Sequence, residues 1–179
     1  AWKMLKALIL HDNPVKFNEK EVFQFLKEVC SKSLEVLKLP HTTFDKDLVR
    51  YLKYSEPKDV REISLSNRGY NDLEATVIGS NEIWTELKKL DLSENKISDE
   101  GGIRIAGNVA WVNLEEMNFS NNHIGVKCSI ALGNNKAWSK LKILNLSGNS
   151  ICIGGATVIA ANTTWKELET LDLSDNFIA

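Results

Sequence analysis

One eleven-residue phrase occurs four times in the second half of the chain, at a constant spacing. Its first copy runs from Leu87 to Ile97 and reads Leu-x-x-Leu-x-Leu-x-x-Asn-x-Ile. The copies begin at Leu87, Leu114, Leu141 and Leu168, and successive starts are 27 residues apart. A constant period of this length is typical of a solenoid, in which each repeat forms one coil and buries its apolar side against its neighbours. The chain is therefore expected to fold as a stack of similar coils.

The phrase continues less regularly into the first half of the chain. Val60, Ile63 and Leu65 occupy its three apolar positions one period before the first clear copy. We assign seven repeat starts, at Leu5, Leu34, Val60, Leu87, Leu114, Leu141 and Leu168. These predict one continuous domain over residues 1–179. The seventh repeat is truncated at Ala179, which predicts that the domain is a piece of a longer protein.

Each repeat divides into a strand half and a helical half. Alternate side chains of a strand lie on one face, so the leucine pair points inward from a short strand, and successive strands stack in parallel. The asparagine then bridges turns of neighbouring coils, because its amide both donates and accepts. We predict this structural ladder at Asn13, Asn95, Asn122, Asn149 and Asn176. Capping boxes at Asn18–Glu21 and Asn71–Glu74 predict helices that follow the turns.

This phrase resembles that of leucine-rich repeats, and the whole chain is similar to their ribonuclease-inhibitor-like class. Residues 97–102 (Ile-Ser-Asp-Glu-Gly-Gly) resemble the strand-to-helix link of that class. The resemblance implies an α/β fold: a horseshoe-shaped solenoid with a parallel sheet on the concave face and short helices on the convex face. It also implies protein recognition, since the class includes nuclease inhibitors, sensing regions of NOD-like receptors, the Ran GTPase-activating protein and pathogen effectors. The resemblance does not select among these.

Two further residue columns recur with the period. Asparagine occupies positions 81, 108, 135 and 162, which we interpret as helix ends where its tolerance of a left-handed backbone is useful. Tryptophan occupies positions 2, 84, 111, 138 and 165, three residues before five of the seven repeat starts. We expect an internal tryptophan stack; the alternative is an exposed aromatic rail that contacts a ligand.

Composition narrows the classes of partner. The formal net charge of −2 gives no reason to expect nucleic acid or an anionic membrane as a partner. No apolar run approaches the length of about 18 residues that a membrane span needs. The three cysteines, Cys30, Cys128 and Cys152, form no capping cluster, and we expect Cys128 and Cys152 to be buried packing residues. The lack of a cysteine cluster favours a protein that resides in a reducing compartment. We therefore expect a cytoplasmic protein, or one delivered into a host cell if it is an effector.

The outward strand positions are the candidates for binding. In the later coils these positions repeat serine, asparagine and aspartate. This repetition indicates either an acidic concave surface that binds a ligand or a solvated surface without a ligand. The first three coils are less regular, so we expect partner contacts there more than in the last four. The candidate partner-binding residues are Ile9, His11, Val36, Lys38, His41, Arg68 and Tyr70.

Arg68 occupies the ladder position of the third coil, where asparagine is expected. One interpretation is an adjusted loop in which Asn67 replaces the missing amide. The other is an exposed contact point on the rim formed by Arg68 and Tyr70, because arginine and tyrosine are favoured at interfaces.

No set of residues predicts chemistry. His11, Asp12 and His41 lie near each other in the predicted stack, but two histidines and one aspartate are a weak metal signal. His123 and the cysteines form no nucleophile–base pair, so we assign no catalytic, cofactor or metal residues. We expect a non-enzymatic module that binds another protein, with the oligomeric state open. The alternatives are a GTPase-regulating accessory of the Ran GTPase-activating type and a structural spacer or sensor region of a larger receptor or effector.

Overall fold

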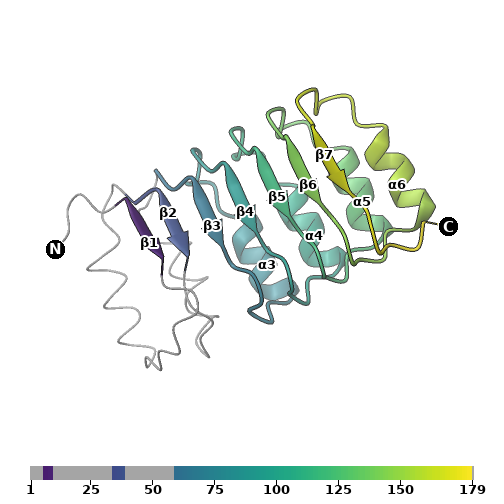
Figure 1. Ribbon diagram of the computed structural model, residues 1–179, viewed down its shortest axis with the longest axis horizontal. Helices are drawn as coiled ribbons and strands as arrows, with labels where there is room; N and C mark the ends of the chain where they lie inside the picture. Colours follow the sequence, from purple (N-terminus) through teal and green to yellow (C-terminus); the bar gives the residue numbers. More distant parts are fainter. Residues whose placement is uncertain (1–5, 10–33, 39–58, 179) are drawn as a thin grey trace.

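A stack of parallel strands with helices on one side forms the molecule, as seen in the computed structural model (Figure 1). The structure describes residues 6–9, 34–38 and 59–178. Within these ranges the strands are β1 (Ala7–Ile9), β2 (Val36–Lys38), β3 (Glu62–Ser64), β4 (Lys89–Asp91), β5 (Glu116–Asn118), β6 (Ile143–Asn145) and β7 (Thr170–Asp172). The helices are α3 (Asp72–Gly79), α4 (Asp99–Ala106), α5 (Val126–Gly133) and α6 (Cys152–Ala160). The capping box predicted at Asn18–Glu21 lies outside these ranges.

The seven strands pair in sequence order and in strict parallel register. Each strand begins two residues after one of the repeat starts, so the register follows the repeat directly. The middle residue of each strand points into the core, and Leu90, Met117 and Leu144 are fully buried there. The residues on either side of it face away from the core and remain open on the concave face. The predicted solenoid with a parallel sheet is confirmed.

The helices lie behind the sheet in Figure 1 and cover its inner face. The capping box predicted for α3 is present: the Asn71 side chain accepts from the Leu73 N–H, and Glu74 accepts from the Asn71 N–H. A carboxylate from one coil also caps the helix of the next. Asp72 accepts hydrogen bonds from the backbone N–H groups of Ser98 and Gly101 at the start of α4, at 2.8 and 3.0 Å.

The predicted asparagine ladder is present in the described coils. In Asn122, Oδ1 accepts from the Ile97 N–H of the preceding coil at 3.0 Å, and Nδ2 donates to the Leu92 and Phe119 carbonyls. Asn95, Asn149 and Asn176 repeat this arrangement. Because each amide satisfies backbone groups of two coils, the buried turns keep their hydrogen bonds. Asn13 lies outside the described residues.

A second asparagine ladder runs along the opposite edge of the sheet, where the helices return to the strands. Asn108 is 5 % exposed; its Nδ2 donates to the Gly79 and Asn81 carbonyls of the preceding coil, and its Oδ1 accepts from the Trp111 N–H. Asn135 and Asn162 repeat these contacts. The expectation that this column uses a left-handed backbone was wrong, because positive φ falls elsewhere, at positions such as Glu94 and Asn121 just before the first ladder. Here too the amide bridges two coils.

The tryptophan column forms an internal stack. Trp84, Trp111 and Trp138 are almost fully buried, and successive ring centroids lie 6.3 Å apart with interplanar angles of 19° and 20°. Trp165 is also buried, at 6 % exposure. The stack ties helix ends to strand starts across the coils, and no described tryptophan forms an exposed rail. Trp2 lies outside the described residues.

Candidate functional site

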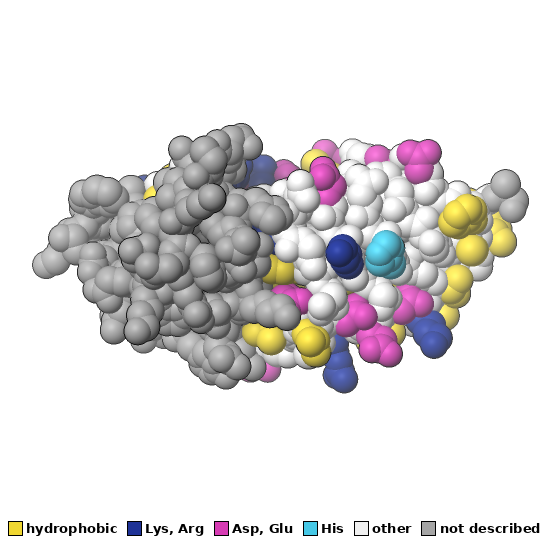
Figure 2. Space-filling model, turned by 90° about the horizontal axis from the view of Figure 1, so that it is seen from below, with side chains coloured by type: hydrophobic (Ala, Val, Ile, Leu, Met, Phe, Trp, Pro, Cys, Tyr) yellow, Lys and Arg dark blue, Asp and Glu magenta, His cyan; other side chains and the backbone are white. Residues whose placement is uncertain are grey.

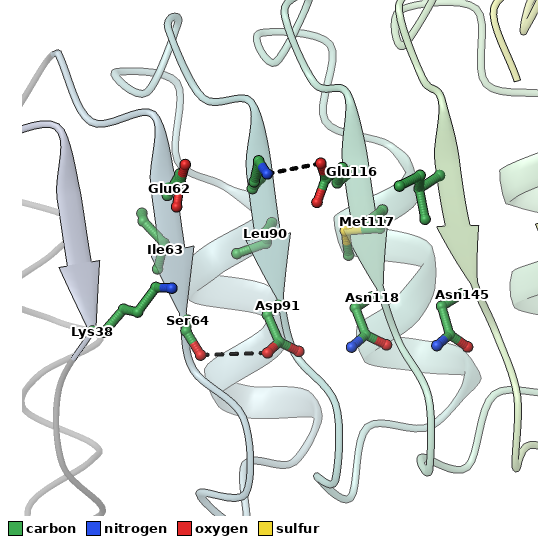
Figure 3. Close-up of a pocket in the computed structure, with 12 residues that line it drawn as sticks. Lys38, Glu62, Ile63, Ser64, Leu90, Asp91, Glu116, Met117, Asn118 and Asn145 are labelled. Carbon is green, nitrogen blue, oxygen red and sulfur yellow. Dashed lines mark hydrogen bonds and ion pairs between the residues drawn. The ribbon is translucent and has the colours of Figure 1, made fainter. Parts of the chain in front are cut away.

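The concave face holds a shallow depression above the middle strands of the sheet (Figure 3). Its volume is about 360 Å³. It is lined by Lys38, Glu62, Ile63, Ser64, Lys89, Leu90, Asp91, Glu116, Met117, Asn118, Ile143 and Asn145. Five strands, from β2 to β6, contribute to it, so the surface exists only because the coils are stacked in register.

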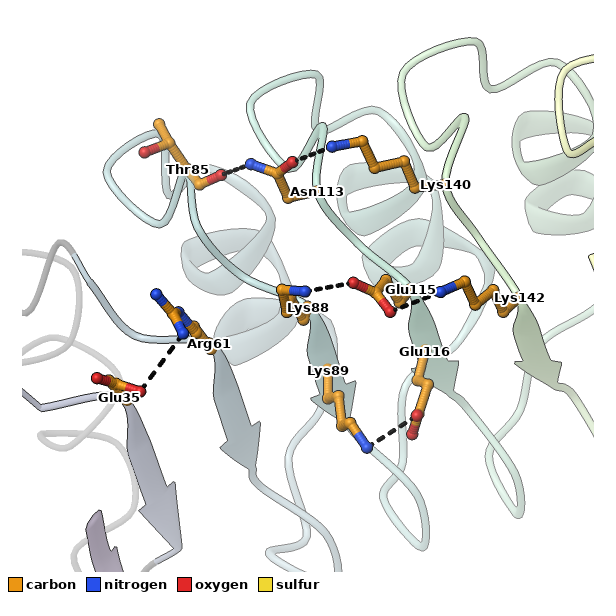
Figure 4. A network of polar contacts seen from close by, with 10 residues as sticks. All are labelled: Glu35, Arg61, Thr85, Lys88, Lys89, Asn113, Glu115, Glu116, Lys140 and Lys142. Carbon is orange, nitrogen blue, oxygen red and sulfur yellow. Dashed lines mark hydrogen bonds and ion pairs between the residues drawn. The ribbon is translucent and has the colours of Figure 1, made fainter. Parts of the chain in front are cut away.

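Charged side chains form a paired strip along the edge where the strands begin (Figure 4). Lys88 and Lys142 both contact the carboxylate of Glu115, at 2.6 and 3.0 Å, and Arg61 lies 3.5 Å from Glu35. Hydrogen bonds from Lys88 and Lys142 lower the pKa of Glu115, and the same contact raises the pKa of Lys142. The pairs are largely exposed, so each contributes little stability. Their main consequence is that the strip presents little uncompensated charge.

Inside the depression the charges are only partly paired. Lys89 and Glu116 form an ion pair at 2.8 Å, and this hydrogen bond raises the pKa of Lys89. Lys38 and Glu62 form no ion pair with any residue in the described ranges. The apolar side chain of Ile143, 36 % exposed, borders these polar groups. The depression therefore combines an exposed apolar side chain with charges that have no ion-pair partner among the described residues.

The opposite side of the depression is a row of Asp and Asn side chains at the ends of the strands. Each has one side-chain oxygen held by the backbone N–H two residues later: Ser93 for Asp91, Ser120 for Asn118 and Ser147 for Asn145, each at 3.0 Å. Asp172 repeats the contact with Ser174 at 2.9 Å. The hydrogen bonds from Ser174 lower the pKa of Asp172, so this carboxylate is ionised at neutral pH.

The predicted partner-binding residues of the first two coils fall into two groups. Lys38 lines the depression, Ile9 is 53 % exposed on the concave face, and Val36 is half-buried beside it. His11 and His41 lie outside the described residues. Residues of coils three to six that were not among the candidates, such as Glu62 and Asn145, also line the depression; their repetition along the sequence resembled a purely structural pattern.

The expected contact point on the rim at Arg68 and Tyr70 was wrong. Both side chains are buried, at 7 % and 2 % exposure. The reason is the next coil: Oδ1 of Asn95 accepts from the backbone N–H groups of both residues, at 3.0 Å each, and closes the turn against it. Asn67 is exposed with a φ of 53°, so its side chain does not take the buried ladder position.

Chemically reactive groups are sparse in the described part of the chain. Cys128 is buried, and burial together with the nearby Asp99 carboxylate raises the pKa of its thiol, which makes it unreactive. Cys152 is partly exposed, contrary to the expectation that it is buried. No group of three or more His, Cys, Asp and Glu side chains within residues 6–9, 34–38 and 59–178 is arranged to hold a metal ion.

The lower edge of the molecule, where the strand-to-helix turns lie, offers a less organised surface (Figure 2). Charged side chains of both signs are scattered over its middle, and hydrophobic side chains gather toward the C-terminal end. Exposed apolar residues of these coils include Ile153 and Phe177, at 62 % and 72 % exposure. Among the helices that the structure describes, none combines the length and the apolar character that crossing a membrane requires.

Comparison with protein families identifies the repeat. Two leucine-rich repeat family models match the chain, one over residues 85–106 and the other over residues 113–135 and 140–160. These segments are coils four, five and six of the stack, so the chain carries leucine-rich repeats and folds as a leucine-rich-repeat solenoid. Domains of this kind generally mediate protein–protein interactions and are typically not enzymes. No curated protein matches the chain.

Proposed function

We propose that this chain is a non-enzymatic recognition module that holds a segment of a protein partner in the depression of its concave face. One observation carries the proposal. Several charged groups of the depression take no part in the hydrogen bonds that hold the backbone, because the two asparagine ladders, the helix caps and the Asp and Asn side chains at the strand ends supply these bonds. Free groups such as Lys38 and Glu62 are therefore available to a ligand.

The variation along the outward columns supports the same conclusion. The first outward position reads Glu62, Lys89, Glu116, Ile143 and Thr170 along successive strands, whereas the inward position is always a large apolar residue. Packing constrains the inward column in every coil, and it does not constrain the outward column. The outward column changes from charged to apolar residues within five coils, so a partner can bind it favourably in only one register.

The position of the depression changes where along the stack we expect the partner to bind. The irregular spacing of the first coils favoured binding there, whereas the depression extends from β2 to β6. We therefore propose that contacts centre on coils three to five and include Lys38 at one end. The convex helices support assignment to the ribonuclease-inhibitor-like class of leucine-rich repeats, although the period of 27 residues is shorter than the 28 or 29 residues typical of that class.

The proposal is tested by filling the depression with bulk and charge. A double variant, Ser64→Arg with Ile143→Arg, places two long side chains on the concave floor. A matched control, Leu73→Arg with Val109→Arg, places the same side chains at positions that are 72 % and 74 % exposed outside the concave face. Photo-crosslinking from the full chain identifies partners, and each purified partner is then titrated against the three proteins.

We expect the concave double variant to weaken a true partner's binding by about tenfold or more, because buried charge and lost contacts at an interface each cost several-fold in affinity. The control is expected to bind like the parent chain, and both variants should keep the parent's melting temperature within a few degrees. Partners that bind the concave variant with unchanged affinity would contradict the proposal.

A further inference from the structure

Four outward side chains at the ends of β4 to β7 form a regular series: Asp91, Asn118, Asn145 and Asp172, here named the Asx row. Each belongs to a different coil and is paired in register with its neighbour in the row. The first three line the depression, and the fourth, Asp172, continues the row on the next strand toward the C-terminal end. The row is thus a continuous polar edge of the proposed binding face.

The row presents a fixed order of hydrogen-bonding groups. In every member one oxygen is held by the backbone N–H of the serine two residues later, which fixes the direction of the remaining side-chain atom. That atom is a carboxylate oxygen in Asp91 and Asp172 and an amide nitrogen in Asn118 and Asn145. Figure 3 shows the two amide nitrogens turned the same way along the sheet. The sequence of free groups is acceptor, donor, donor, acceptor.

These groups are open to a ligand. Neither Asn118 Nδ2 nor Asn145 Nδ2 donates a hydrogen bond within the described part of the chain, and Asp172 Oδ2 accepts none there. Asp91 Oδ2 accepts one long bond, from Ser64 at 3.4 Å. The paired strip at the other edge of the sheet has its acids neutralised by lysine and arginine. The two carboxylates of the row have no such partner among the described residues.

The spacing of the row selects a ligand geometry. Neighbouring strands lie about 4.8 Å apart, so Asp91 and Asp172, separated by three strand spacings, are about 14 Å apart. An extended chain rises about 3.3 Å per residue, so four residues of it cover about this distance. Residues four apart in an extended segment also point to the same side.

We propose that the Asx row binds an extended segment of the partner protein in which two lysine or arginine residues four positions apart meet Asp91 and Asp172, while backbone carbonyls between them accept from Asn118 and Asn145. This inference rests on the proposed function and states which partner chemistry the concave face takes. The two amides determine the register in which the segment binds. The two carboxylates determine the preference for basic residues, because charge-assisted hydrogen bonds are stronger than hydrogen bonds between neutral groups.

The test uses synthetic peptides of defined sequence as the probe. Each peptide has an alanine and threonine background and two arginines, placed from two to six positions apart, and its affinity for the full chain is measured by fluorescence anisotropy. We expect the tightest binding at a spacing of four. The double variant Asp91→Asn with Asp172→Asn should bind that peptide about tenfold more weakly, because both charge-assisted contacts are lost.

Two controls separate specific recognition from general attraction to acidic groups. Glu86→Gln with Glu167→Gln removes two exposed carboxylates that are also three coils apart but belong to another column, and binding should not change. Asn118→Asp with Asn145→Asp makes the row more acidic and keeps the serine contact, since Asp91 and Asp172 show that aspartate makes it. We expect this variant to bind about tenfold more weakly despite its charge, because the donors to peptide carbonyls are gone.

Two results would overturn the inference: affinity independent of arginine spacing, or stronger binding to the Asn118→Asp, Asn145→Asp protein. A random peptide library displayed against the full chain distinguishes this failure from failure of the proposed function. Selected peptides that lose affinity for the Ser64→Arg, Ile143→Arg protein but lack paired basic residues would leave the concave site standing and overturn the row's specificity. Selected peptides indifferent to that variant would contradict both.

Discussion

At the scale of single residues, asparagine serves three different purposes in this chain, and its surroundings decide which. Asn122 bridges buried turns in the first ladder, Asn108 bridges helix ends in the second, and Asn118 offers a free amide on the concave face. In all three the side-chain oxygen accepts from a backbone N–H. The difference lies in where Nδ2 points: to a neighbouring coil's carbonyl in the ladders and to solvent in the Asx row. Substitutions should therefore affect stability in the ladders and binding in the row.

Replacing a ladder amide should destabilise the whole fold. We predict that Asn122→Leu lowers the free energy of unfolding by about 1–3 kcal/mol, because the Ile97 N–H and the Leu92 and Phe119 carbonyls lose their partner in a buried turn. Asn134→Leu, at an exposed helix end, is the control and should change stability by less than about 0.5 kcal/mol. Urea denaturation followed by circular dichroism measures both, and equal effects would contradict a ladder role.

At the scale of elements, neighbouring helices approach so closely that a side chain has no room at certain positions. A Cβ on Gly133, the last residue of α5, would lie 2.6 Å from the carbonyl oxygen of Val158 in α6. On Gly154, in α6 itself, a Cβ would meet nothing within 4 Å. The two glycines thus differ in purpose, although both lie in short helices of the same convex layer.

This difference predicts opposite effects of the same substitution. Gly133→Ala should destabilise the fold by about 1–3 kcal/mol, because backbone atoms of α6 must move to admit the methyl group. Gly154→Ala should stabilise it by about 0.5–1 kcal/mol, because alanine loses less conformational freedom in a helix. Thermal unfolding of the two variants beside the parent chain measures the contrast, and a loss of stability in both would refute it.

Helix caps that reach across coils make part of the stability depend on pH. Burial favours the neutral form of Asp72, but the hydrogen bonds from Ser98 and Gly101 outweigh it and lower the pKa of this carboxyl below its usual 3.8. A group whose pKa is lower in the folded state contributes stability above its unfolded pKa, and loses it as the pH falls through the folded value. The link between α3 and α4 therefore weakens below about pH 4.

We predict that Asp72→Asn lowers stability near neutral pH and reduces the steepness of acid destabilisation below about pH 4. Glu82→Gln, which removes an exposed carboxylate from the loop after α3, is the matched control. Unfolding free energies measured in urea between pH 7 and pH 2 provide the comparison. A parallel acid dependence in the parent chain and Asp72→Asn would show that the cap does not titrate as proposed.

At the scale of the whole molecule, the tryptophan stack and the two ladders run along the later coils, between Asn81 and Asn176. Each coil contacts only its neighbours, so stability is transmitted along the stack from interface to interface. Trp111 lies between Trp84 and Trp138 and is fully buried, which places it at the centre of this series. A cavity there should weaken coils three, four and five first.

We predict that Trp111→Ala destabilises the protein by about 3–5 kcal/mol, because a large buried ring is lost and its cavity cannot close fully. Backbone hydrogen exchange should accelerate most in coils three to five, which contain Trp84, Trp111 and Trp138, and less in β7, which lies two coils further along the stack. Mass spectrometry of exchanged peptides resolves the difference. Uniform acceleration along the chain would mean that the stack unfolds as one cooperative unit.

Much of the fold was predictable from the sequence, because it depends on contacts between equivalent positions one period apart. The spacing of Leu87, Leu114 and Leu141 determined the strands and their inward residues, and the asparagine at the end of each phrase determined the first ladder. The same regularity predicted the buried tryptophans. In each case one residue type at one position in the coil suffices, since the neighbouring coil repeats the same environment.

Only the tertiary structure decided how side chains that differ between coils are arranged. Arg68 and Tyr70 suggested an exposed rim, but Asn95 of the next coil closes their turn and buries them. The outward residues suggested a monotonous surface, but stacking pairs Lys88 with Glu115 on one edge and leaves Asp91 without an ion pair on the other. A repeat period determines which coil lies beside which. It does not determine which atoms of unlike side chains come within bonding distance, since that depends on the register, twist and turn geometry of the assembled coils.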